Sequence, residues 1–145
     1  MTMLSHDLQM TPRLIESLYL EAMVLADEAR GYFDHVAKSD RDLLGAADRV
    51  AFSCESLKVT TRLMHVIAWL LHRKAEAAGE VIEGGGRLGH AAITEPTVRD
   101  VMPEAARALI AATSDLYDRV VRLDNAPCAG ESPARALMSR LQGAF

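Results

Sequence analysis

The sequence predicts an all-α fold, a three-helix antiparallel bundle in which the second helix is unusually long. Three observations support this prediction. Small and apolar residues recur at alternating steps of four and three along three stretches, no stretch alternates like a half-buried strand, and a glycine-rich segment separates the second stretch from the third. Since residues three and four apart share one face of an α-helix, each periodic stretch predicts one helix.

The second helix is predicted from about residue 40 to residue 78, which is roughly 55–60 Å at about 1.5 Å per residue. We expect its periodic positions to form the seam that faces the other helices. They are Leu43, Ala47, Val50, Cys54, Leu57, Thr61, Met64, Ala68, Leu71, Ala75 and Ala78. Ser39 or Asp40 would cap the start of this helix, and Gly79 would end it in a left-handed conformation.

The first helix is predicted from Pro12 to Ala37, with Thr11 as its cap and the proline in the first turn, where a missing N–H has no cost. The break at Lys38–Asp40 is short, and this favours an antiparallel neighbour. The apolar stripe of the first helix consists of Leu18, Ala22, Leu25, Ala29, Tyr32 and Val36.

The third helix is predicted to start near Pro103 and to stop at Asn125–Pro127, after a flexible glycine-rich connection and a short helical lead-in at Thr94–Pro96. Its stripe consists of Ala105, Leu109, Ala112, Leu116, Val120 and Leu123. We expect residues 1–124 to form a single domain and residues 125–145 to form a C-terminal tail, either a short amphipathic helix or a mobile segment.

Composition and charge exclude several classes of function. The net charge of −4 argues against a general nucleic-acid binder, which would carry a basic face. The N-terminus has no signal-peptide pattern, and the longest strongly apolar run, Val66–Leu71, is too short to cross a bilayer. The two cysteines are not expected to pair, and the predicted location is the cytoplasm.

No constellation in the sequence predicts catalysis, a metal site or a cofactor. His65 and His72 lie seven residues apart on one helix, about 10.5 Å along its axis, so they cannot bind one metal ion together. Cys54 and His65 are also too far apart on one helix to act as a nucleophile and its base. The Gly84–Arg87 run lacks the strand and the Gly-Lys-Ser/Thr sequence that a phosphate-binding loop requires. We therefore expect no enzyme and no small-molecule substrate.

The second helix carries more apolar surface than one seam uses, so the excess would meet a second copy of the chain, a fourth short helix or a partner protein. Of these we expect a second copy, most simply with two-fold symmetry. The residues predicted for this dimer interface are Phe52, Val59, Leu63, Val66, Trp69 and Leu70. A narrow polar stripe remains, and it reads either as a solvated face or as a partner-docking strip. It consists of Asp48, Glu55, Lys58, Arg62, His65, His72 and Glu76.

Glu55–Met64, with the sequence ESLKVTTRLM, is followed by Ala68–Leu71, Arg73, Ala75 and Gly79-Glu80. This pattern resembles the alphaproteobacterial family of RcdA, the regulator of CtrA degradation, otherwise labelled only as a domain of unknown function. The resemblance implies a self-associating three-helix bundle that acts as an adaptor. In that family the adaptor brings cell-cycle regulators to the ATP-dependent protease ClpXP, in concert with a response-regulator-like protein that primes the unfoldase.

A flexible C-terminal tail is tied to adaptor activity in that family, whereas the tail here departs from a purely polar one because it contains Ala134, Leu137, Met138 and Leu141. The leading interpretation is a non-catalytic adaptor that binds protein cargo and protease-associated proteins. The alternatives are a homodimeric transcription-associated regulator and a purely structural oligomer. The residues predicted to contact partners are Glu55, Lys58, Arg62, His65, Leu137, Met138 and Leu141.

Overall fold

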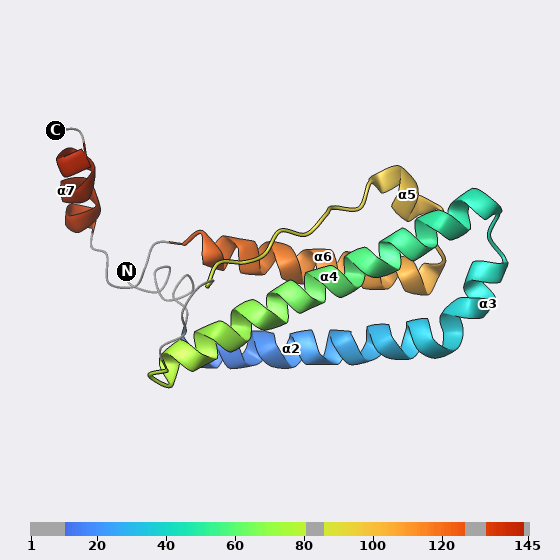
Figure 1. Ribbon diagram of the computed structural model, residues 1–145, viewed down its shortest axis with the longest axis horizontal. Coiled ribbons are helices and arrows are strands. Elements are labelled where there is room, and N and C mark those ends of the chain that lie inside the picture. Colours follow the sequence, from blue (N-terminus) through green and yellow to red (C-terminus); the bar gives the residue numbers. More distant parts are fainter. Residues whose placement is uncertain (1–10, 81–85, 127–132, 144–145) are drawn as a thin grey trace, which may run out of the picture.

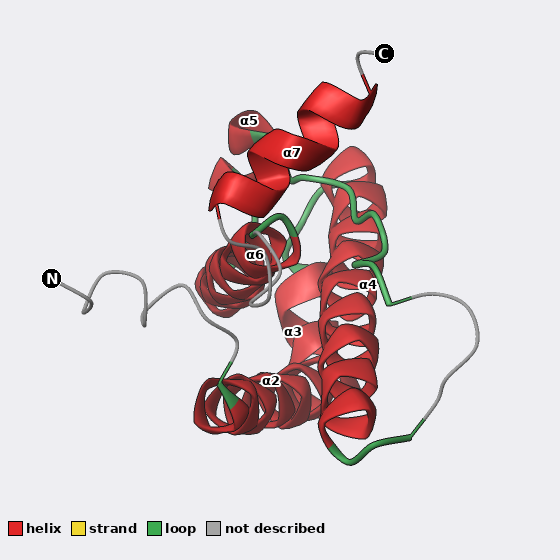
Figure 2. Cartoon of the chain, turned by 90° about the vertical axis from the view of Figure 1, so that its left-hand side faces the viewer, coloured by secondary structure: helices red, strands yellow, loops and turns green. Residues whose placement is uncertain are grey.

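The computed structural model describes residues 11–80, 86–126 and 133–143, and every regular element in these ranges is helical. The all-α prediction is confirmed. The elements are α2 (Pro12–Gly31), a π-helical turn η1 (Tyr32–Val36), α3 (Ala37–Asp42), α4 (Ala46–Ala77), α5 (Pro96–Asp100), α6 (Glu104–Asp124) and α7 (Pro133–Gly143). The longest is α4, with 32 residues. In Figure 2, α2 and α6 are seen nearly end-on, one above the other, and α4 runs past both of them at an angle.

The directions of the three long helices follow from the length of their connections. A short break joins α3 to α4, so α4 runs antiparallel to α2, as predicted (Figure 1). Residues 86–95 instead run back along the bundle to α5. For this reason α6 runs in the same direction as α4 and antiparallel to α2 (Figure 1).

The start of α2 agrees with the prediction, but its end does not. Thr11 caps the helix by accepting a hydrogen bond from the Leu14 N–H at 3.1 Å, and Pro12 follows in the first turn. The helix then passes through η1 into α3, so the break falls at residues 43–45 instead of 38–40. The N-cap residue of α4 is Gly45, and Gly79 follows the helix end with φ of 80°.

Ser39 and Asp40 do not cap α4, because both have partners closer along the chain. The Ser39 hydroxyl donates to the Val36 carbonyl at 2.9 Å, and the Tyr32 hydroxyl donates to Asp40 Oδ2 at 2.7 Å. The second bond ties η1 to α3, and the buried Tyr32 ring also packs against Phe33 and Phe52. This corner therefore holds the chain helical past the predicted break.

We expect Tyr32→Phe to change the alkaline stability of the bundle. Burial, together with the hydrogen bond and negative charge of Asp40, raises the pKa of the Tyr32 phenol above its usual value. The folded state therefore favours the protonated phenol, and the stability from it is present below about pH 10 and lost as the pH rises further. Urea unfolding at pH 7 should show a loss of about 1 kcal/mol in the variant. Between about pH 9.5 and 11.5, the variant should lose stability less steeply than the wild type; equal slopes would contradict this assignment.

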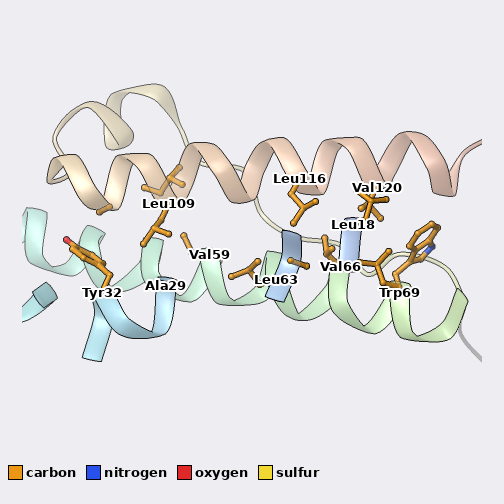
Figure 3. Packing of buried hydrophobic residues seen from close by; sticks show 14 of the residues in the cluster. Leu18, Ala29, Tyr32, Val59, Leu63, Val66, Trp69, Leu109, Leu116 and Val120 are labelled. Atoms are coloured by element: carbon orange, nitrogen blue, oxygen red, sulfur yellow. The ribbon is translucent and has the colours of Figure 1, made fainter. Parts of the chain in front are cut away.

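The core corrects the prediction of which face of α4 is buried. The six residues predicted to meet a second copy, Phe52, Val59, Leu63, Val66, Trp69 and Leu70, are at most 5% exposed within one chain. Leu109, Leu116 and Val120 of α6 point toward them (Figure 3). The predicted seam instead faces outward, where Leu57 is 67% and Met64 63% exposed. The dimer interface predicted from these six residues is therefore wrong.

A difference in side-chain size explains this reversal. The buried face of α4 presents phenylalanine, tryptophan, leucine and valine, whereas every second position of the predicted seam is alanine, cysteine or threonine. Burial stabilises by about 25 cal/mol per Å² of apolar surface, so the bundle gains more by enclosing the bulkier face. In the flanking helices Leu109, Leu116 and Val120 are buried as predicted, whereas Val36 and Ala105 are exposed.

Candidate functional site

The middle of the polar stripe of α4 is covered by another part of the same chain. Residues 86–94, which we call the strap, run extended alongside α4 and α6 (Figure 1). Beneath this segment Glu55 is 3% and Arg62 2% exposed, while Lys58 and His65 are half-buried. The prediction that Glu55 and Arg62 contact a partner protein is therefore wrong, because both side chains are enclosed.

Arg62 is the centre of this contact. Its guanidinium donates to the Ala92 carbonyl at 3.2 Å, to Thr94 Oγ1 at 2.6 Å and to Thr113 Oγ1 on α6 at 3.4 Å. Thr94 in turn donates to Glu55. Burial lowers the pKa of the Arg62 guanidinium, and the negative charges of Glu55 and Asp118 oppose that shift. An arginine so placed remains charged and joins α4, the strap and α6.

The remainder of the strap is held mainly through its backbone. The Tyr117 hydroxyl donates to the Gly89 carbonyl at 2.6 Å and accepts from the Ala91 N–H at 3.1 Å. Asp124 accepts from the Leu88 N–H at 3.2 Å and from Trp69 Nε1 at 3.0 Å. These side chains satisfy backbone groups that neither a helix nor a sheet pairs.

The close fit of the strap over α4 explains why Lys58 and His65 of the stripe are half-buried. A Cβ on Gly89 would lie 2.8 Å from His65 Nδ1, so any larger residue there would force the His65 ring or the strap to shift. Lys58 donates to Glu55 at 2.9 Å and to the Ile93 carbonyl at 3.3 Å. The strap therefore packs on the middle of the polar stripe. The periodicity of this stripe was visible in the sequence, but its partners Thr94, Tyr117 and Asp124 gave no signal there.

The outward side of α4 is an apolar surface with no charge. We define the open face as Ala47, Val50, Cys54, Leu57, Thr61, Met64, Ala68 and Leu71. Val50, Leu57, Met64 and Leu71 are between 47% and 67% exposed. From Val50 to Leu71, every residue of α4 that is exposed is uncharged, since Ser53 and Thr60 complete the set. Exposed helix faces usually carry charges, so this surface is a candidate for protein contact.

Two further surface features carry apolar side chains. A groove of about 330 Å³ between α2 and α4 borders the open face, and its lining includes Phe33, Met64 and Ile67 together with the charged residues Arg30 and Asp34. On α7, Leu137, Met138 and Leu141 are 58%, 61% and 52% exposed. Figure 1 shows this helix beyond the end of α6, away from α2. The sequence predicted a short helix here as one of two possibilities.

The described residues contain no group of three or more His, Cys, Asp or Glu side chains placed to hold a metal ion. Across the same ranges no helix is long and apolar enough to span a membrane. Cys54 is an exposed free thiol on the open face. His65 lies under the strap, on the other side of α4, so the two residues do not form a reactive pair.

Comparison with known proteins identifies the family. The family model described as "Protein of unknown function (DUF1465)" matches residues 6–145. The crystal structure of RcdA from Caulobacter crescentus CB15 matches 81% of this chain and 92% of that one, with 29% sequence identity and a TM-score of 0.64. No curated protein matches the chain. The predicted resemblance to RcdA is confirmed, and the chain belongs to the DUF1465 family.

Proposed function

We propose that this protein is a non-catalytic cytoplasmic adaptor that brings protein cargo, such as cell-cycle or transcriptional regulators, to the ClpXP protease. Its similarity to RcdA in sequence and fold supports this role. The arrangement of the described residues fits a binding protein, because the buried polar groups of α4 hold the strap in place and large apolar side chains are left on the surface.

The observation that carries the proposal is the apolar surface of α7. Leu137, Met138 and Leu141 occupy positions i, i+1 and i+4, so they share one side of the helix. All three are more than half exposed, although burial of such side chains is worth roughly 1.5–3 kcal/mol each. We propose that residues 125–145 act as a unit apart from the bundle, and that this apolar side of α7 binds cargo or a protease-associated protein.

The expected result of Leu137→Asp combined with Leu141→Asp is the loss of partner binding with an intact bundle. An aspartate at each of the two positions would place a negative charge where the partner buries apolar surface. We expect affinity purification from the native host, read by mass spectrometry, to recover ClpX and cargo with the wild-type chain. Recovery should fall at least tenfold with the double variant and with a chain lacking the last fifteen residues.

A matched control and a second readout make this test decisive. Gln142→Asp adds a negative charge to the same helix at an exposed polar position and should leave recovery unchanged. In cells that lack the chain, the half-lives of the recovered cargo proteins should lengthen at least twofold after translation is blocked. Wild type should restore them, and the double variant should not. Unchanged half-lives in the deleted strain would refute the adaptor role.

A further inference from the structure

A groove of about 370 Å³ runs between α2 and α6. Its lining consists of Leu20, Glu21, Val24 and Leu25 from α2 and Ala112 and Asp115 from α6. Since this lining comes from α2 and α6 alone, the groove opens on their side away from α4. In Figure 2, α4 runs past one side of α2 and α6, and no described helix lies against the other side. The bundle therefore has a place for a fourth helix along this groove.

The helix α7 has the apolar spacing that this groove requires. Leu137 and Leu141 are four residues apart, as are Leu20 and Val24, and all four side chains are more than half exposed. Residues four apart form the ridges by which helices pack against one another. A helix α7 that folds back along α6 runs antiparallel to α6 and hence parallel to α2. Leu137 then lies beside Leu20, and Leu141 lies beside Val24, so one contact buries both apolar pairs.

The connection between α6 and α7 is long enough for this position. Eight residues, 125–132, separate Asp124 from Pro133. An extended chain of eight residues spans up to about 28 Å, whereas the groove residue Asp115 lies only about 14 Å from the end of α6 along its axis. Such a short tether holds α7 at an effective concentration of the order of millimolar. The chain's own α7 is therefore favoured over the α7 of another copy.

The charges of the groove and of α7 are complementary. The two ionisable side chains that line the groove, Glu21 and Asp115, are both carboxylates, and both contact Arg119. One guanidinium balances one of the two negative charges and leaves the other for a second cation. Arg140 lies in the last turn of α7, three residues after Leu137, and α7 contains no acidic residue. Docking therefore brings Arg140 to the acidic edge of the groove.

We propose that α7 docks in the groove between α2 and α6 as a fourth helix of the bundle, with Leu137 beside Leu20 and Leu141 beside Val24. Figure 1 shows α7 beyond the end of α6, which is the undocked position. The side of α7 that docks is the side assigned above to partner binding, so docking hides it and is autoinhibitory. This consequence rests on the proposed function, whereas the docking itself does not. A docked fraction of about nine-tenths lowers the apparent affinity for the partner about tenfold.

The first test reads the docked position with thiols, in a full-length chain in which Cys54 and Cys128 are replaced by serine. Val24→Cys combined with Leu141→Cys should form a disulfide within one chain on mild oxidation, in most of the molecules. The control pair is Leu71→Cys with Leu141→Cys. Leu71 is also about half exposed, but it lies on the open face of α4, on the other side of the bundle. This pair should crosslink about tenfold more slowly.

The second test measures how fast trypsin cuts after Arg140 in the full-length chain. Docking shields this bond, so the cleavage rate follows the undocked fraction of α7. Val24→Lys removes an apolar contact and gives the two carboxylates a second cation, so it should release α7 and raise the rate about tenfold. Leu57→Lys makes a comparable change on the open face, at a position that is 67% exposed, and should leave the rate unchanged. Both variants should keep the helix content of the wild type.

Contrary outcomes separate the docking from its consequence. Equal crosslinking of the two cysteine pairs, or equal cleavage in wild type and Val24→Lys, would overturn docking in this groove. Disulfides that join two chains would assign the groove to the α7 of a second copy and overturn the contact within one chain. Affinity purification from the native host should recover about tenfold more ClpX with Val24→Lys than with wild type, and equal recovery would overturn the autoinhibition. Crosslinking and cleavage use purified protein, so failure of the adaptor role in the half-life test would leave both results standing.

Discussion

Val66→Asp should unfold the bundle. Val66 is 1% exposed and lies on the side of α4 that faces Leu116 and Val120 of α6 (Figure 3). A carboxylate there would lose its hydration without a cation to pair with, so it would either stay charged at high cost or take up a proton. We expect a loss of more than about 4 kcal/mol, a large part of the stability of a domain of this size.

The control for this prediction lies on the same helix. Leu57→Asp makes a comparable change at a position that is 67% exposed, and thermal unfolding followed by circular dichroism should give a melting temperature within a few degrees of the wild type. The Val66→Asp variant should show no cooperative unfolding transition over the same temperature range. A folded Val66→Asp variant would mean that this side of α4 is not the core.

Arg62→Ala should be the most destabilising change to a polar side chain. It would leave Glu55 buried and would remove the donor to Thr94, Thr113 and the Ala92 carbonyl. Arg62 and Glu55 attract each other and are joined through Thr94, and removing one of two interacting buried charges costs about 3–5 kcal/mol. We expect about 3 kcal/mol, near the lower end of that range, because Lys58 stays 2.9 Å from Glu55 and neutralises part of its charge. Urea unfolding would measure the loss.

A double variant tests whether the loss comes from the unpaired charge. Arg62→Met combined with Glu55→Met removes both charges and keeps apolar volume under the strap, so it should cost clearly less than the sum of the two single changes. Digestion with trypsin should also cut at Arg87 faster in Arg62→Ala than in the double variant. Additive losses, or a loss below about 1 kcal/mol for Arg62→Ala, would contradict the role of Arg62 as the anchor of the strap.

More of the fold than of the candidate site could be predicted from the sequence. Helix caps depend on local chemistry, so Thr11 and Pro12 at the start of α2 and the left-handed Gly79 after the end of α4 were predictable from neighbouring residues. The break before α4 was not, because Tyr32 binds Asp40 eight residues further on and holds the chain helical. The direction of α6 was not predictable either, because it depends on whether a long loop crosses the end of the bundle or returns along its side.

The candidate site shows where prediction from periodicity stops. The sequence by itself determined an all-α chain with a long second helix that carries two apolar stripes and one polar stripe, because these features depend only on spacing along one helix. Only the tertiary structure decided that the stripe with Trp69 and Leu70 is buried, that the stripe with Leu57 and Met64 is exposed, and that the strap covers Arg62. The physical reason is that burial depends on the total surface that all elements can enclose together, and no single helix contains that information.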